Sequence, residues 1–115
     1  MFYIVYYMTL SRLGEFELSV LVAVARLGDT AYGASVRENL SSAAGREYSV
    51  GAVGTTLQRL EDKRLVVSWF SAPEPVRGGR AKRCFKLTPA GRRALAFARE
   101  ASRRLWAGDA LGNER

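Results

Sequence analysis

The chain has 115 residues with 18 lysines and arginines, 11 aspartates and glutamates and no histidine, which gives a formal net charge of +7 at pH 7. Its length suits one domain, and its 48% hydrophobic and 25% charged residues are typical of a folded globular protein. Without histidine and with Cys84 as its single cysteine, the chain lacks the parts of a histidine-based triad, a tetrahedral zinc site or a disulfide framework, so we expect neither an enzyme nor a cofactor.

Residues 1–12 open with an apolar, aromatic segment, FYIVYYM at residues 2–8. This segment is too short to cross a membrane. No basic residue precedes it and no small-residue cleavage site follows it before Arg12, so we expect a cytoplasmic protein without a signal peptide. Two interpretations of residues 1–12 stay open: an N-terminal arm, or an extension introduced by gene annotation upstream of Met8.

Two helices are predicted in the first half of the chain. Residues 15–27 are largely apolar with helical spacing, and Gly28 follows as a helix stop. Asp29 and Thr30 offer caps for a second helix over residues 32–44.

A third helix is predicted over residues 50–63, with Ser49 as its N-cap. One face is apolar and is expected to turn toward the core; it comprises Val50, Val53, Leu57 and Leu60. The opposite face carries small or hydrogen-bonding residues, namely Gly51, Ala52, Thr55, Gln58, Arg59 and Asp62. A helix with so slim an exposed face fits the major groove of DNA.

After the third helix the pattern changes from helical to extended. Residues 65–72 are rich in β-branched and aromatic side chains, which predicts a strand. Residues 81–87 are interpreted as the returning strand of a hairpin, because prolines and glycines separate the two runs. We expect Trp69, Phe70 and Phe85 to pack within this hairpin.

The positive charge is concentrated in the second half of the chain. Residues 1–58 contain four basic and five acidic side chains, whereas residues 59–115 contain fourteen and six. Residues 76–93 include seven basic side chains and no acidic one. This density favours a polyanionic partner, either nucleic acid or an anionic membrane surface, although charges on a hairpin are often only a solvated edge.

The last predicted helix covers residues 89–107, with Thr88 as its N-cap and Pro89 in its first turn. A lone terminal helix would expose apolar side chains that a symmetric partner could cover. The expected dimer-interface residues are Phe97, Ala101, Leu105 and Trp106. Residues 108–115 are expected to be a flexible tail.

These elements predict a mainly α fold with a small β-hairpin: a winged helix-turn-helix over residues 13–88, followed by a C-terminal dimerisation helix. In this arrangement the third helix enters the major groove and the hairpin, or wing, reaches the neighbouring backbone or minor groove of DNA. The expected contacts from the third helix are Ser49, Thr55, Thr56, Gln58 and Arg59. Those expected from the wing are Arg77, Gly78, Gly79, Arg80, Lys82 and Arg83.

The chain also resembles the PadR-type winged-helix transcriptional regulators, over about residues 13–106. The similar motifs are Ala31-Tyr32-Gly33, Ser49-x-Gly51-Ala52-Val53, Leu57-x-Arg59-Leu60-Glu61, Leu65, Arg77-Gly78-Gly79-Arg80, Lys82-Arg83 and Leu87-Thr88-x-x-Gly91. The resemblance implies a homodimeric, sequence-specific repressor or activator that binds double-stranded DNA and whose last helix helps to form the dimer.

The sequence departs from the pattern of that family in three respects, which concern four positions. Gly54 stands where relatives commonly carry an aromatic residue, and Cys84 and Phe85 replace a usual pair of tyrosines. Arg64 stands where the family usually has glycine, so it must adopt a left-handed conformation under strain or leave the helix differently.

Our leading hypothesis is a cytoplasmic bacterial regulator, a homodimeric repressor of transcription. A first alternative is a winged-helix module that binds protein and has no specific DNA target. A second is a membrane-surface module that uses the N-terminal aromatic segment together with the basic residues. The sequence names no effector, and we expect no metal or cofactor.

Overall fold

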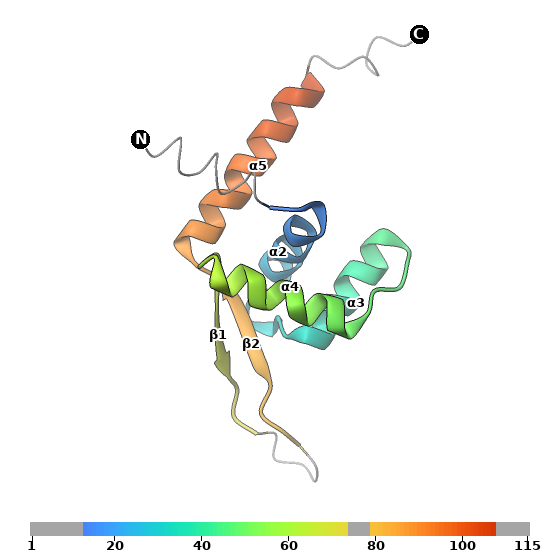
Figure 1. Ribbon diagram of the computed structural model, residues 1–115, viewed down its shortest axis with the longest axis vertical. Coiled ribbons are helices and arrows are strands. Elements are labelled where there is room, and N and C mark those ends of the chain that lie inside the picture. Colours follow the sequence, from blue (N-terminus) through green and yellow to red (C-terminus); the bar gives the residue numbers. More distant parts are fainter. Residues whose placement is uncertain (1–12, 74–78, 108–115) are drawn as a thin grey trace.

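The computed structural model describes residues 13–73 and 79–107 (Figure 1). Its elements, in chain order, are α2 (Glu15–Leu27), the short 3-10 helix η1 (Gly28–Thr30), α3 (Gly33–Ala44), α4 (Val50–Asp62), β1 (Val66–Phe70), β2 (Arg83–Leu87) and α5 (Pro89–Ala107). The predicted arm at residues 1–12 and tail at residues 108–115 lie outside the described residues. The predicted fold class is confirmed within the described residues: the helices α2, α3 and α4 precede a two-stranded hairpin and a C-terminal helix.

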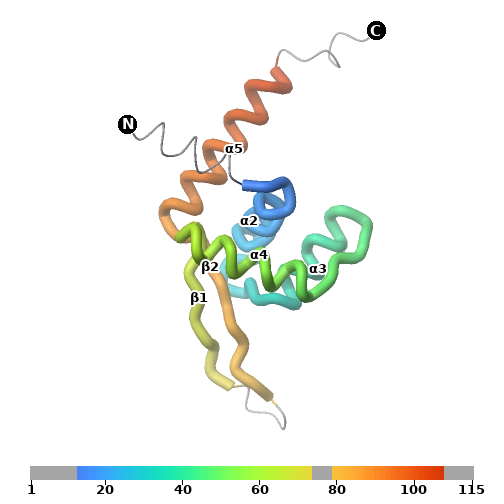
Figure 2. The backbone as a smooth tube through the Cα atoms, viewed as in Figure 1, coloured from blue at the N-terminus to red at the C-terminus, as the bar shows by residue number. Residues whose placement is uncertain are grey.

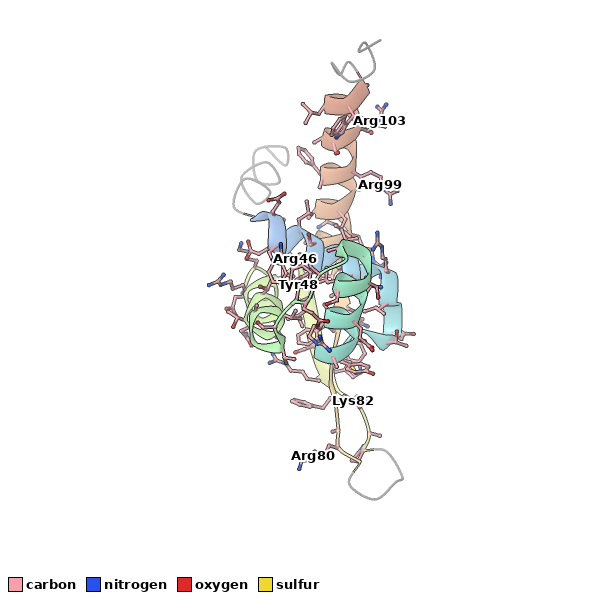
Figure 3. The ribbon with its side chains drawn as sticks, turned by 90° about the vertical axis from the view of Figure 1, so that its right-hand side faces the viewer. Arg46, Tyr48, Arg80, Lys82, Arg99 and Arg103 are labelled. Carbon is pink, nitrogen blue, oxygen red and sulfur yellow. The ribbon has the colours of Figure 1, made fainter. Side chains whose placement is uncertain are left out.

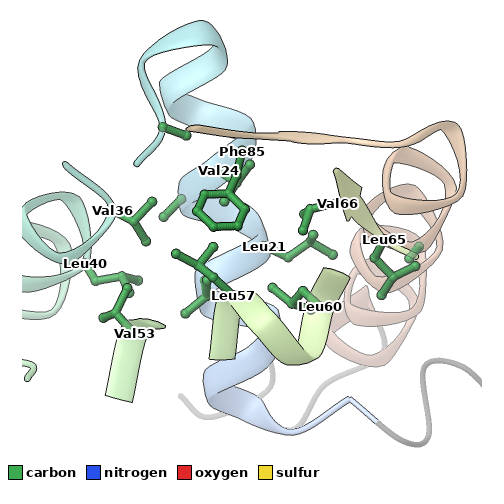
Figure 4. Packing of buried hydrophobic residues seen from close by; sticks show 14 residues of the cluster. Leu21, Val24, Val36, Leu40, Val53, Leu57, Leu60, Leu65, Val66 and Phe85 are labelled. Atoms are coloured by element: carbon green, nitrogen blue, oxygen red, sulfur yellow. The ribbon is translucent and has the colours of Figure 1, made fainter. Parts of the chain in front are cut away.

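The hydrophobic core lies where α2, α3, α4 and the hairpin meet. α2 runs through its centre, because its Val20, Leu21 and Val24 are almost completely buried. Figure 4 shows Leu21 and Val24 among side chains from the surrounding elements, namely Val36 and Leu40 of α3, Val53, Leu57 and Leu60 of α4, and Val66 and Phe85 of the hairpin. No helix within the described ranges is long and apolar enough to span a bilayer.

The apolar stripe of α4 is one residue shorter than predicted. Val53, Leu57 and Leu60 are buried, but Val50 is 63% exposed. Val50 is the first residue of the helix, directly after the N-cap, and lies at the edge of the core. The expectation that Val50 faces the core is therefore wrong.

The predicted caps are half correct. The Oγ of Ser49 accepts a hydrogen bond from the backbone nitrogen of Ala52 at 3.0 Å, as expected for the N-cap of α4.

The cap predicted for α3 is not found at Thr30. Residues 28–30 form η1, in which the Thr30 hydroxyl donates to the Leu27 carbonyl at 2.6 Å. The N-cap of α3 is Tyr32, whose backbone nitrogen donates to the Oγ of Ser35 at 2.9 Å. The expectation that Thr30 caps α3 is wrong, because its hydroxyl closes the end of α2.

The hairpin is antiparallel, with a register that runs from Val66 opposite Leu87 to Phe70 opposite Arg83. Its inner end is attached to the helical body, because the Phe85 nitrogen donates to the Ala31 carbonyl at 2.8 Å. From there the hairpin projects away from the helices (Figure 2). Phe85 is buried in the core that the hairpin shares with the helices, whereas Trp69 and Phe70 are 36% and 71% exposed. The expected packing of all three side chains within the hairpin is therefore wrong for Phe70.

A tight junction connects the end of α4, the hairpin and the start of α5. Arg64 takes a left-handed conformation with φ of 62°. An L-residue in this region is strained by about 1 kcal/mol or more, so Arg64 follows the first of the two expected alternatives, a left-handed conformation under strain. The Thr88 hydroxyl donates to the Arg64 carbonyl at 2.8 Å and accepts from the Gly91 nitrogen at 3.0 Å, which confirms Thr88 as the N-cap of α5.

Among the described residues, α5 packs against the helical body through its first half. Gly91 and Ala94 are its buried residues. Beyond them the helix projects away from the other elements, on the side opposite the hairpin tip (Figure 1). Leu105 and Trp106 near its end are 76% and 54% exposed.

Candidate nucleic-acid interface

The exposed face of α4 is slim and polar, as predicted. Burial of Val53, Leu57 and Leu60 turns the opposite side of the helix to solvent. The residues on that side are exposed; they are Gly51, Ala52, Gly54, Thr55, Gln58, Arg59 and Asp62. None of these carries a bulky apolar side chain, so the backbone of α4 can approach a groove closely.

Thr56 does not belong to this face. Its side chain is only 4% exposed. It lies three residues after Val53 and four before Leu60, which places all three on the same side of an α-helix. The expectation that Thr56 contacts DNA is therefore wrong. Its helical spacing from Val53 and Leu60 indicates the buried side of α4, although its polar side chain suggested the exposed side.

Two of the predicted groove residues already have partners within α4. The Oγ of Ser49 accepts the capping hydrogen bond from Ala52. The Gln58 amide donates to Asp62 Oδ1 at 3.0 Å across one turn of exposed helix. Such an exposed pair is worth only about 0.5 kcal/mol, so the amide of Gln58 can exchange Asp62 for another acceptor at little cost.

The residues predicted on the wing differ in their position along the hairpin and in their exposure. Arg77 and Gly78 lie outside the described residues. Gly79 is half-buried, and Arg80 is exposed toward the far end of the hairpin (Figure 3). Lys82 lies nearer the body, where its ammonium group is 4.3 Å from the centroid of the Tyr32 ring.

Arg83 is oriented differently from the other wing residues. Its guanidinium forms an ion pair with Glu61 of α4 and donates from Nε to the Oγ of Ser68 at 3.2 Å. The side chain of Arg83 is therefore directed at α4 and not along the hairpin. The spacing of Arg83 and Glu61 in the sequence does not indicate this ion pair.

A largely buried ion pair attaches the end of α4 to α2. Lys63 Nζ donates to both carboxylate oxygens of Glu17, at 2.9 and 3.0 Å, and the Gly14 nitrogen donates to Oε1 at 2.9 Å. Burial raises the pKa of Glu17, but the hydrogen bond from Gly14 and the hydrogen bond and charge of Lys63 outweigh it, so the pKa is lowered. Glu17 is thus a carboxylate at neutral pH, and it helps to hold α4 in place.

The basic residues in the second half of α5 are remote from the wing. Figure 3 shows Arg99 and Arg103 at the opposite end of the molecule from Arg80. Glu100 binds both Arg103 and Arg104, at 2.6 and 3.2 Å. The hydrogen bond from Arg103 is the main reason that the pKa of Glu100 is lowered. The positive charge that the sequence concentrates after residue 58 is therefore divided between two regions.

A groove borders the residues expected at a dimer interface. It has a volume of about 500 Å³ and is lined by α2 and α5; its apolar side chains are Leu18, Val22, Ala25, Leu95 and Ala98. On α5 itself, Phe97 is half-buried, and Ala101 is exposed together with Leu105 and Trp106. In the described part of the chain, no group of three or more cysteine, aspartate or glutamate residues is placed to hold a metal ion.

Comparison with known proteins gives one family and a set of similar structures. The model of the PadR-like family of transcriptional regulators matches residues 20–97. RosR from H. salinarum is 23% identical, with a TM-score of 0.67 over 86% of this chain and 82% of that chain. A PadR family transcription regulator from Clostridium difficile is 26% identical, with a TM-score of 0.58 over 76% of this chain and 88% of that chain.

A third similar structure contains a nucleic acid. Bacillus subtilis PadR, solved in complex with operator DNA, is 15% identical, with a TM-score of 0.62 over 75% of this chain and 47% of that chain. A search of curated proteins gives no significant match. The three solved structures show a similarity of fold. The match to the family model, in contrast, extends over more than half of this chain.

Proposed function

The chain belongs to the PadR-like family of transcriptional regulators, and on that premise we propose that it is a homodimeric repressor that binds double-stranded operator DNA sequence-specifically. The observation that carries this proposal is the contact between α4, with its slim polar face, and a hairpin that bears Arg80, Lys82 and Arg83. Residues 13–88 are the DNA-binding part in this proposal, and residues 89–107 the dimerising part.

In the groove, the reading residues are Thr55, Gln58 and Arg59. An arginine can donate two hydrogen bonds to the O6 and N7 of guanine, and a glutamine can pair with the N6 and N7 of adenine. On binding, the Gln58 amide exchanges its hydrogen bond to Asp62 for hydrogen bonds to an adenine. Ser49, at the N-terminus of α4, suits a phosphate oxygen, because helix N-termini attract anions.

On the wing, Arg80 and Lys82 are the proposed phosphate contacts. Such contacts fix the position of the protein on the duplex and carry no sequence information of their own. Arg77, Gly78 and Gly79 are proposed to complete the wing surface. The operator-bound structure of the Bacillus subtilis relative supports DNA as the partner of this fold.

The exposure of Leu105 and Trp106 supports the homodimer. Two large apolar side chains at 76% and 54% exposure on a projecting helix are unfavourable in water. In a symmetric dimer, each α5 would cover the other and would fill the groove beside Leu18 and Val22. The other two expected interface residues, Phe97 and Ala101, also lie on α5. A two-fold axis then presents two α4 helices to successive major grooves.

Repression is the proposed sign of regulation. A dimer that occupies a promoter blocks it without any contact to the transcription machinery. Because the partner is chromosomal DNA, we place the protein in the cytoplasm. A reporter under the promoter of its own gene should fall in expression when the protein is supplied, and a rise would contradict repression.

A mobility-shift titration tests the binding. The duplexes are the promoter of its own gene and a random duplex of equal length and composition. We expect the promoter to bind at least about a thousandfold more tightly. We also expect log Kd to change with log salt with a slope of about 5 to 9, as for a dimer that neutralises about six to ten phosphates. Equal affinity for both duplexes, or no salt dependence, would contradict the proposal.

A further inference from the structure

Three side chains from three elements form a closed ring between α4 and the hairpin. The Ser68 hydroxyl of β1 donates to Glu61 Oε2 of α4 at 2.8 Å. Arg83 of β2 donates from Nε to the same Ser68 oxygen at 3.2 Å, and from Nη2 to Glu61 Oε1. Both carboxylate oxygens and two guanidinium nitrogens are therefore engaged.

The guanidinium of Arg83 is also packed against the sheet. Its Cζ lies 5.3 Å from the centroid of the Phe85 ring, and Phe85 belongs to the buried core. A planar guanidinium held between an aromatic face, a hydroxyl and a carboxylate has few alternative orientations. The ring is thus a directional link from the core-anchored hairpin to α4.

Apart from this ring, the hairpin meets α4 at its inner end, where Val66 and Phe85 lie in the same core cluster as Leu57 and Leu60. The hairpin is also attached to the segment that follows η1, through the hydrogen bond from the Phe85 nitrogen to the Ala31 carbonyl. It joins α4 through Arg64, a residue in a left-handed conformation at the end of the helix. A two-stranded hairpin fixed at one end can pivot, and the ring formed by Glu61, Ser68 and Arg83 opposes that pivoting.

We propose that these three residues, the clamp, set the orientation of the wing relative to α4, and that Arg83 is a positioning residue that acts through Glu61 and Ser68 instead of neutralising a phosphate. The inference rests on the proposed function, in which α4 and the wing contact one duplex at the same time. Rigid placement of both elements lowers the entropy cost of binding. The clamp also neutralises Glu61, which would otherwise repel the DNA backbone.

The orientation is tested first on the free protein. Residual dipolar couplings of backbone amides report the direction of the hairpin relative to α4. In the native protein, we expect the amides of β1, β2 and α4 to fit one alignment tensor. In Glu61→Gln and Arg83→Lys, the couplings of β1 and β2 should shrink or require a second tensor, while those of α2, α3 and α4 stay together.

Ser68→Ala is the milder variant, should either substitution impair folding. Arg80→Gln is the matched control, because it removes a wing cation outside the clamp. Unchanged hairpin couplings in every clamp variant would overturn the proposal. This measurement involves no DNA, so it decides the clamp even if the proposed function fails.

The second arm measures promoter binding as a function of salt. Arg83→Lys keeps the positive charge, so a phosphate contact would survive it. We expect Arg83→Lys, Arg83→Gln and Glu61→Gln each to weaken binding about tenfold, equivalent to one charge-assisted hydrogen bond, with the native salt slope. The double variant Glu61→Gln with Arg83→Gln should be no weaker than either single variant.

Arg80→Gln should instead lower the salt slope by about 1 for each phosphate that is no longer neutralised. The clamp is contradicted if Arg83→Gln lowers the slope as Arg80→Gln does while Glu61→Gln binds as tightly as the native protein. If the native protein did not prefer its promoter, the proposed function would be refuted. The residual dipolar couplings of the free protein would still test the clamp.

Discussion

Gly91 lies so close to Leu65 that a Cβ atom on Gly91 would be 2.1 Å from the Leu65 carbonyl oxygen. The same oxygen accepts a hydrogen bond from the Thr88 nitrogen at 3.0 Å. Leu65 directly precedes β1, and Gly91 is in the first turn of α5. This close approach therefore fixes the proposed DNA-binding and dimerising parts to one another.

Gly91→Ala should destabilise the fold. The methyl group would meet a backbone atom, which cannot rotate away, so we expect a loss of about 2 to 3 kcal/mol in the free energy of unfolding. Gly54→Ala is the control, because a methyl group on this helical glycine would meet no side chain or neighbouring element within 4 Å. That change should stabilise α4 by up to about 1 kcal/mol. Urea denaturation measures both, and a Gly91→Ala variant as stable as the native protein would be inconsistent with the close approach of Gly91 to Leu65.

Glu17→Gln should make stability less dependent on pH. A carboxyl group whose pKa is lower in the folded than in the unfolded chain stabilises the fold above the unfolded value, and this contribution is lost as the pH falls through the folded value. At pH 7 the native protein should be more stable than Glu17→Gln by about 1 to 2 kcal/mol. The difference should decline as the pH falls below 4.5, the ordinary pKa of the group.

Denaturation at a series of pH values measures this difference. Glu15→Gln is the control, because Glu15 is in the same first turn of α2 but is exposed. A gap between the native protein and Glu17→Gln that stays constant down to strongly acidic pH would argue against the ion pair with Lys63.

Arg59→Ala and Arg80→Ala should weaken DNA binding in different ways. If Arg59 makes a bidentate contact to a base, its loss removes about 1 to 3 kcal/mol of discrimination at that base pair. Loss of Arg80 should weaken all duplexes alike and reduce the salt slope. Competition by promoter duplexes with single base-pair changes measures both effects. Undiminished discrimination by Arg59→Ala would remove Arg59 from the proposed reading face.

Leu105→Glu should dissociate the proposed dimer without unfolding the protomer. Leu105 is exposed on a part of α5 that contributes no buried residue to the body, so a charge there affects only a partner. Ala96→Glu is the control, since it lies nine residues earlier on the other side of the same helix. Light scattering at micromolar concentration should find a dimer for the native protein and Ala96→Glu, and a monomer for Leu105→Glu. A native monomer would contradict the proposed interface.

Local patterns in the sequence predict most of the elements. Apolar spacing followed by glycine marks the ends of α2 and α3, and Ser49 and Thr88 mark the starts of α4 and α5, because these signals act over one or two helical turns. Two of the differences from the expectations concern tertiary surroundings. Val50 is exposed because it opens α4 at the edge of the core. Arg83 meets Glu61 across 22 residues, a separation that no helical or strand period encodes.

Selection of bound oligonucleotides from a random pool tests the central claim most directly. Two α4 helices related by a two-fold axis should enrich a palindromic sequence with half-sites about one helical turn, or about 10 base pairs, apart. Arg59→Ala should enrich a more degenerate version of the same sequence. A pool that stays random after selection, or one that yields a single motif without two-fold symmetry, would contradict sequence-specific recognition by a homodimer.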